Sequence, residues 1–122
     1  MILRHLFPAA AALCAALAAT PAAARPLTPE ERTGLACASA FALVAAGQAR
    51  GDPAMTQYPP LGTRGREYFV RLSAQLMDDA GLDRDAIAAL SRQQAEALRR
   101  TGVAAVMPTC LAALDADIPP AR

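Results

Sequence analysis

The sequence lacks several residue types on which common catalytic and binding sites depend. It has no lysine and no tryptophan, and its one histidine is His5, near the first residue. If the N-terminal segment is removed, no histidine remains, which excludes His-ligated metal sites and Ser-His or Cys-His catalysis. The motifs Gly-x-Ser-x-Gly and Cys-x-x-Cys-His, which mark hydrolase nucleophiles and haem attachment, are also missing. We therefore predict a protein that is not an enzyme and has no cofactor and no metal.

Charge and composition limit the folds and the classes of partner that are possible for this chain. All 12 basic residues are arginines, and 11 acidic residues leave a net charge of +1. Such balance argues against electrostatically driven binding of nucleic acid. Aromatic residues make up only 4%, whereas 32 of the 122 residues are alanine, which has the best intrinsic helix propensity. The length and this composition predict one all-helical domain.

The N-terminus has the three parts of a secretory signal peptide, here residues 1–24. A short cationic start precedes an apolar run over about 6–19, and small residues follow at 22–24. We predict cleavage after Ala24, with a cut after Ala22 as the alternative, and hence a periplasmic or secreted protein. A retained membrane anchor is the competing interpretation, although the uncharged stretch is of marginal length and rich in alanine.

Two cysteines remain after this cleavage, Cys37 and Cys110. The cut removes one arginine and no acidic residue, so residues 25–122 have no net charge. An exported domain with two cysteines is expected to oxidise them to a disulfide. The sequence contains no Cys-x-x-Cys and no cation beside either cysteine, which favours a structural bond over redox chemistry.

The first helix is predicted to begin after Thr28. Thr28 and Glu31 match a capping box, and Pro29 suits the first helical position. The helix should run to about Ala49. Because residues 33–49 carry no charge, we expect it to be buried in the centre of a bundle rather than to span a membrane, for which it is too short and too polar.

The remaining chain predicts two or three more helices. Residues 51–63 contain three prolines and two glycines and are expected to form a loop. A second helix is predicted over 64–80, joined in an antiparallel hairpin to a third that starts at 84. Gly81 supplies the left-handed cap of the second helix, and Asp83 caps the third.

The structure of the last part of the chain is less clearly predicted. Gly102 and Pro108 interrupt residues 84–116, so the sequence does not decide between one kinked helix and two. Residues 117–122 are expected to be a loose tail. The predicted fold over 25–122 is therefore a small three- to four-helix bundle, with its first and last helices linked by the disulfide.

One segment suggests a binding site, the run Gly62-Thr63-Arg64-Gly65-Arg66. Arginines in a first helical turn face the positive end of the helix dipole, which is mildly unfavourable. Together with exposed backbone amides, Arg64 and Arg66 could hold a phosphate, sulfate or carboxylate. The alternative is that both are solvated arginines paired with nearby acids. An acidic cluster over 78–85 lacks the glycine and glutamate spacing of a calcium loop.

Two pentads, Leu27-Thr28-Pro29-Glu30-Glu31 and Leu90-Ser91-Arg92-Gln93-Gln94, carry a resemblance to a known family. They resemble the Leu-Thr-x-x-Gln pattern of helical periplasmic chaperones of the Spy and CpxP type, with Glu31 in place of Gln and Ser91 in place of Thr. The resemblance covers about ten residues and implies a periplasmic chaperone or an envelope-stress protein. Capping alone also explains both pentads.

The sequence thus favours an exported, non-catalytic helical module that binds a protein or an envelope component. We expect this module to have no stable membrane span after signal cleavage and no affinity for nucleic acid. The alternatives are the periplasmic chaperone and a protein that binds a small anion or another small ligand through Arg64 and Arg66.

Overall fold

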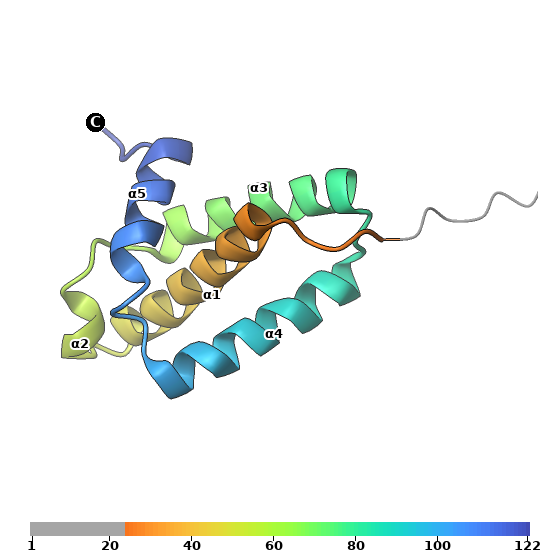
Figure 1. Cartoon of the computed structure of the whole chain (residues 1–122). Helices are drawn as coiled ribbons and strands as arrows, with labels where there is room; N and C mark the ends of the chain where they lie inside the picture. The colour runs from red at the N-terminus through yellow and green to blue at the C-terminus, as the bar shows by residue number, and fades with distance from the viewer. Residues whose placement is uncertain (1–23) are drawn as a thin grey trace, which may run out of the picture.

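The computed structural model describes residues 24–122, so the predicted signal peptide lies outside the described residues up to Ala23. Within this range the chain forms helices and no strand (Figure 1). They are α1 (Pro29–Ala49), α2 (Pro53–Thr56), α3 (Gly62–Ala80), α4 (Arg84–Thr101) and α5 (Met107–Asp117). The predicted all-α fold is confirmed, with four long helices and one short one.

Helix α1 occupies the centre of the molecule. Its start follows the predicted capping box: the Glu31 amide donates to Thr28 Oγ1 at 3.1 Å, and the Thr28 amide donates to the Glu31 carboxylate at 2.9 Å. α1 contacts every other helix and lies between α3 and α4 (Figure 1). Leu35, Phe41 and Val44 of α1 are fully buried. None of the helices over 24–122 is at once long enough and apolar enough to cross a membrane.

A tight turn joins α3 to α4, as predicted. Gly81 ends α3 with a left-handed φ of 69°, and the Leu82 amide donates to the Leu76 carbonyl at 3.3 Å. The Asp83 carboxylate then accepts a hydrogen bond of 2.8 Å from the Ala86 amide at the start of α4. The two helices diverge from this turn, and each packs mainly against α1 rather than along the other (Figure 1).

Residues 51–63 are more ordered than the predicted loop. Helix α2 lies within them, and α3 begins at Gly62, two residues before the predicted start. The Gln48 side chain holds the segment: its Nε2 donates to the carbonyls of Met55, Tyr58 and Pro59, and its Oε1 accepts from the Leu61 amide. One side-chain amide thus supplies the hydrogen-bond partners that the backbone of this proline-rich segment cannot supply for itself.

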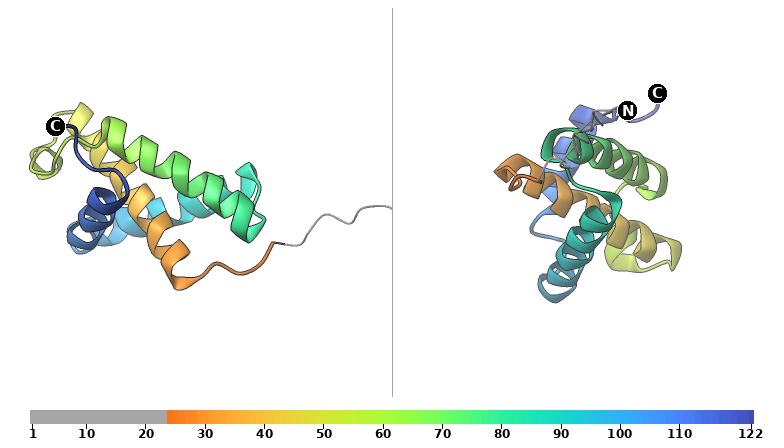
Figure 2. Two further views of the ribbon diagram at one scale, coloured as in Figure 1. Left: turned by 90° about the horizontal axis from the view of Figure 1, so that it is seen from above. Right: turned by 90° about the vertical axis from the view of Figure 1, so that its right-hand side faces the viewer.

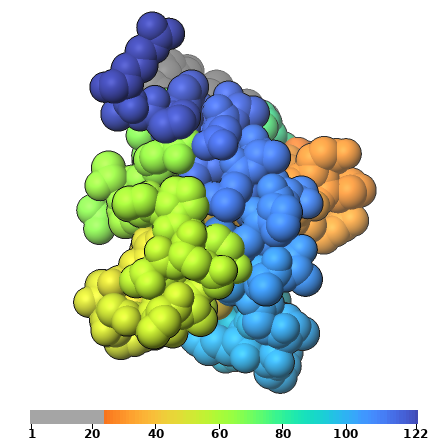
Figure 3. Space-filling view, turned by 90° about the vertical axis from the view of Figure 1, so that its left-hand side faces the viewer, coloured from red at the N-terminus to blue at the C-terminus, as the bar shows by residue number. Residues whose placement is uncertain are grey.

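The chain between 84 and 116 forms two helices, which settles the open question. Gly102, with φ of 82°, ends α4, and Pro108 lies in the first turn of α5. α5 covers the end of the molecule opposite the α3–α4 turn (Figure 2). Seen from that end, it lies between the α2 segment and the first residues of the described chain (Figure 3).

The predicted loose tail over 117–122 is too long by two residues. Asp117 is the last residue of α5, and Ile118 is only 5% exposed. The Ile118 carbonyl also accepts a hydrogen bond of 2.6 Å from the Arg64 guanidinium. Burial of the Ile118 side chain therefore holds the chain in place as far as that residue.

The core is apolar and crosslinked. The predicted disulfide between Cys37 and Cys110 is present, with 5.1 Å between the two Cα atoms, and it joins α1 to α5. Both cysteines are at most 2% exposed. The largest fully buried side chains around them come from α1, α3, α5 and the residue before α3, and they are Phe41, Leu35, Leu61, Leu76, Met107, Leu114 and Val44.

Candidate functional site

A groove of about 500 Å³ lies between α1, α3 and α4. It lies away from the α3–α4 turn, between the first half of α3 and the second half of α4. Its floor is the face of α1 that carries Ala38, Ala42 and Ala46, spaced one helical turn apart. Because these side chains are small, α1 leaves space between the two flanking helices. The remaining apolar lining residues are Phe41, Leu43, Ala45, Leu61, Phe69 and Ala95.

Gly65 fixes one wall of this groove. A Cβ atom at this position would lie 2.9 Å from Phe41 Cβ, closer than side-chain packing allows. The glycine therefore lets α3 approach α1 closely. The first turn of the predicted helix was expected to offer free amides to an anion, but the Gly65 amide is bonded to the Leu61 carbonyl at 2.9 Å within α3.

Three arginines line the groove: Arg66 from α3 and Arg92 and Arg99 from α4. Arg92 and Arg99 are two helical turns apart and so lie on the same face of α4. Within residues 24–122, none of the three forms a salt bridge. No acidic side chain is among the groove-lining residues of the described chain. The groove thus combines an apolar floor with positive charge that has no partner.

Two serines add polar groups to the groove. Ser39 Oγ is buried and donates to the Leu35 carbonyl at 2.9 Å. Ser91 Oγ is also buried, and it has no hydrogen-bond partner among the described residues. A buried hydroxyl without a partner carries a desolvation cost, which a bound ligand could offset.

The structure does not bring Arg64 and Arg66 to a common site. The Arg64 guanidinium donates to Asp115 at 2.7 Å and to the Ile118 carbonyl, so it ties the start of α3 to the end of α5. Residues two apart on a helix point about 200° from each other, and Arg66 accordingly lines the groove that Arg64 does not. Sequence reasoning missed Arg92 and Arg99 because their pairing with Arg66 depends on how α4 packs.

A second cavity, of about 380 Å³, lies between α1, α3 and the end of α5. Tyr68 lines it and is 7% exposed, with its ring packed edge-on against Phe41 at 5.3 Å between centroids. Burial, and the charge of Asp117, raise the pKa of the Tyr68 hydroxyl, which therefore stays neutral. The other lining residues are Glu30, Glu31, Gly34, Arg71, Leu72, Gln75 and Asp117.

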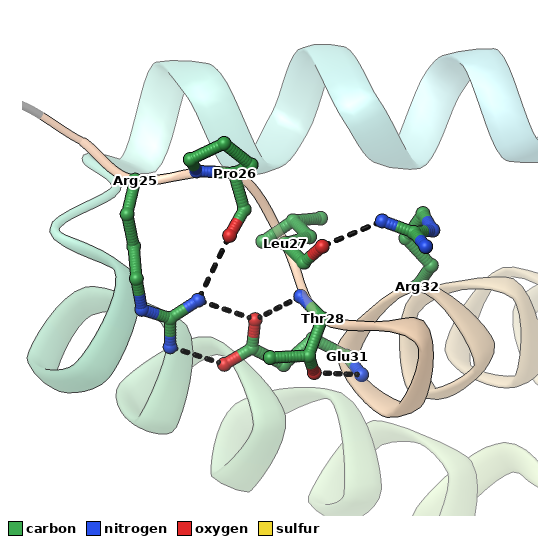
Figure 4. Close-up of polar contacts among 6 residues, drawn as sticks. All are labelled: Arg25, Pro26, Leu27, Thr28, Glu31 and Arg32. Carbon is green, nitrogen blue, oxygen red and sulfur yellow. Dashed lines mark hydrogen bonds and ion pairs between the residues drawn. The ribbon is translucent and has the colours of Figure 1, made fainter.

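The first described residues form a polar clasp (Figure 4). The Arg25 guanidinium donates to both Glu31 carboxylate oxygens, at 2.9 and 2.7 Å, and its backbone amide donates to the Ala80 carbonyl at 3.1 Å. These bonds from Arg25, with the one from the Thr28 amide, lower the pKa of Glu31 to about 2. Both charges are satisfied by each other, so the clasp is a structural element rather than a ligand site.

The described chain has no group of three His, Cys, Asp or Glu side chains that could hold a metal ion. Comparison of the whole chain with protein-family models, with curated proteins and with solved structures found no match. The two chaperone-like pentads occupy different environments, since Thr28 caps α1 whereas Ser91 lies inside α4. The candidate binding sites are therefore the groove between α1, α3 and α4 and the cavity between α1, α3 and the end of α5.

Proposed function

We propose that the protein is an exported, non-catalytic binding module whose groove holds a small amphipathic anion: an alkyl chain that ends in a carboxylate, sulfonate or phosphate. The observation that carries the proposal is the position of Arg66, Arg92 and Arg99 around an alanine floor with no acidic residue. The volume of about 500 Å³ lies within the usual range of small-molecule sites.

Two forces favour this class of ligand over a neutral or a cationic one. Each methylene group moved out of water contributes about 0.8 kcal/mol, for which the alanines and Phe69 supply an apolar surface. The guanidinium groups can form paired hydrogen bonds with an acidic headgroup. Ser91 Oγ offers one further hydrogen bond inside the groove.

Export fits the same ligand class. The signal-like residues 1–24 would take the chain to an envelope compartment, where amphipathic anions are released from lipids and from the surroundings. A groove lined by alanine and arginine could also accept an acidic amphipathic peptide, as the chaperone alternative requires. Binding of such a peptide instead of the alkyl anion would favour that alternative and contradict our proposal.

Titration of the isotope-labelled protein with dodecanoate, followed by NMR, tests the proposal. We expect the amides of Ala42, Ala46 and Ala95 to shift, and dodecyltrimethylammonium to leave them unchanged. Replacing Arg66, Arg92 and Arg99 by Gln should weaken dodecanoate binding roughly tenfold for each residue that contacts the headgroup.

Arg84→Gln is the matched control, because Arg84 is an exposed arginine on the same α4 that does not line the groove. It should bind dodecanoate as the unmodified protein does. If dodecanoate leaves the groove amides unshifted, or if the triple variant binds it as tightly as Arg84→Gln does, the proposal is wrong.

A further inference from the structure

We propose that the cavity between α1, α3 and the end of α5 is a second binding site, which takes a small alkyl diamine in its doubly protonated form. The inference does not depend on the function proposed for the groove. It rests on three observations: the charges that remain unpaired in the cavity, a largely buried tyrosine whose hydroxyl has no partner among the described residues, and an acidic residue at an unfavourable helix position.

The cavity has a net negative charge. Four charged side chains line it, and two of them are neutralised by neighbours: Glu31 by Arg25, and Arg71 by Glu67, each at 2.7 Å. The other two, Glu30 and Asp117, form no salt bridge within residues 24–122. The lining therefore presents two uncompensated carboxylates, one from the start of α1 and one from the end of α5.

Tyr68 supplies a hydrogen-bonding group at the same place. The side chain is 7% exposed and its hydroxyl bonds to no group in the described part of the chain, although it lines the cavity. Gly34 keeps the space beside the hydroxyl open, since a Cβ atom there would lie 3.6 Å from Tyr68 Oη. A phenol oxygen can accept a hydrogen bond from an ammonium group.

Asp117 lies where a carboxylate opposes the helix dipole. It is the last residue of α5, whose last turn contains no basic residue. Asp115, two residues earlier in α5, forms a salt bridge with Arg64, so it has a structural role. For Asp117, the Arg71 guanidinium binds the backbone carbonyl at 3.0 Å and leaves the carboxylate unpaired. An acid that opposes local stability without a structural partner is typical of a functional position.

The ligand class follows from these groups. Two carboxylates on different elements match two ammonium groups, and Leu72 with Gly34 provides an apolar surface for a short alkyl linker. The volume of about 380 Å³ suits a molecule of this size. A single metal ion would require at least a third ligand of the kind that the described residues do not group here.

The experiment uses 1,4-diaminobutane as the probe and the disulfide-intact chain as the target, at pH 7 and constant ionic strength. We expect the Gly34 amide and the Tyr68 ring signals to shift in a saturable way, while sodium ions at the same ionic strength leave them unchanged. Asp117→Asn, Glu30→Gln and Tyr68→Phe should each weaken the apparent affinity about fivefold.

Asp117→Asn separates binding from folding. Because it removes a charge that opposes the α5 dipole, it should raise the melting temperature while it weakens diamine binding. Glu96→Gln, which removes an exposed acid on α4 outside the cavity, is the control and should change neither. Unsaturable shifts, or equal affinity of the Asp117→Asn and Glu96→Gln variants for the diamine, would overturn the proposal.

Discussion

At Gly65 a missing side chain decides how closely two helices approach. Alanine normally stabilises a helix interior relative to glycine by about 0.5–1 kcal/mol. Here the added Cβ would meet Phe41 Cβ at 2.9 Å, and both atoms belong to positions fixed by the backbone. The steric cost therefore exceeds the gain in helix propensity.

We expect Gly65→Ala to reduce the free energy of unfolding by about 1–3 kcal/mol, as overpacking typically does. Gly62→Ala is the matched control, because nothing lies within 4 Å of a Cβ atom at that position. It should be neutral or slightly stabilising. Urea denaturation of both variants gives the comparison, and equal stabilities would show that α1 and α3 are not in the close contact described.

Glu31 makes the stability depend on pH in a defined window. Its pKa is about 2 in the folded chain, against 4.5 for the ordinary carboxyl group. A lowered folded pKa stabilises the fold above the unfolded pKa, and this contribution is lost as the pH falls through the folded value. The clasp should therefore weaken progressively from about pH 5 to pH 2.

The measurement is the melting temperature as a function of pH. Glu31→Gln should melt lower than the unmodified protein at pH 7, and the difference should shrink as the pH approaches 2. Glu96→Gln provides a control acid without such partners in the described chain. A constant difference between pH 7 and pH 2 would show that the ion pair with Arg25 does not form.

At the scale of the element, the sequence predicted helix caps, which depend on nearby residues, but not the contacts between helices that are distant in the chain. The start of α1, the end of α3 and the start of α4 were predicted because each cap involves residues at most a few positions apart, as with Thr28 and Glu31. The role of Arg64 could not be predicted, since its partner Asp115 lies 51 residues away. The same holds for the groove, whose arginines meet only after α4 packs against α1.

The end of α3 suggests how signal cleavage would affect an element. Its last turn contains Asp78 and Asp79 but no basic residue, and the Arg25 amide donates to its last carbonyl, that of Ala80, at 3.1 Å. Cleavage after Ala24 would turn that amide into an ammonium group at the negative end of the helix dipole. A chain that begins at Arg25 should then melt a few degrees higher than the same chain with an acetylated N-terminus.

Two comparisons test this effect of the terminus. The difference between free and acetylated chains should disappear above about pH 8, where the α-amino group loses its charge. A chain that begins at Ala23, as the alternative cut requires, should show a smaller effect because its ammonium group lies two residues further from Ala80. Equal melting temperatures for the free and acetylated Arg25 chains would contradict the expected stabilisation.

At the scale of the whole molecule, the two proposed sites depend on different helices. The groove is built by α1, α3 and α4. The cavity proposed to bind a diamine is built by α1, α3 and Asp117 at the end of α5. α5 is bound to α1 through the disulfide between Cys37 and Cys110. Reduction should therefore affect the diamine site before it affects the groove.

The disulfide should also contribute a large share of the stability. It joins residues 73 positions apart, for which the chain-entropy estimate is about 4 kcal/mol, against a typical total of roughly 5–15 kcal/mol for a domain. We expect reductant to lower the melting temperature of the chain that begins at Arg25, and to abolish diamine binding at temperatures where dodecanoate still binds. The Cys37→Ala, Cys110→Ala double variant should behave like the reduced protein and be insensitive to reductant. A melting curve that reductant leaves unchanged would mean that α5 is held by its apolar contacts alone, through Met107, Leu114 and Ile118.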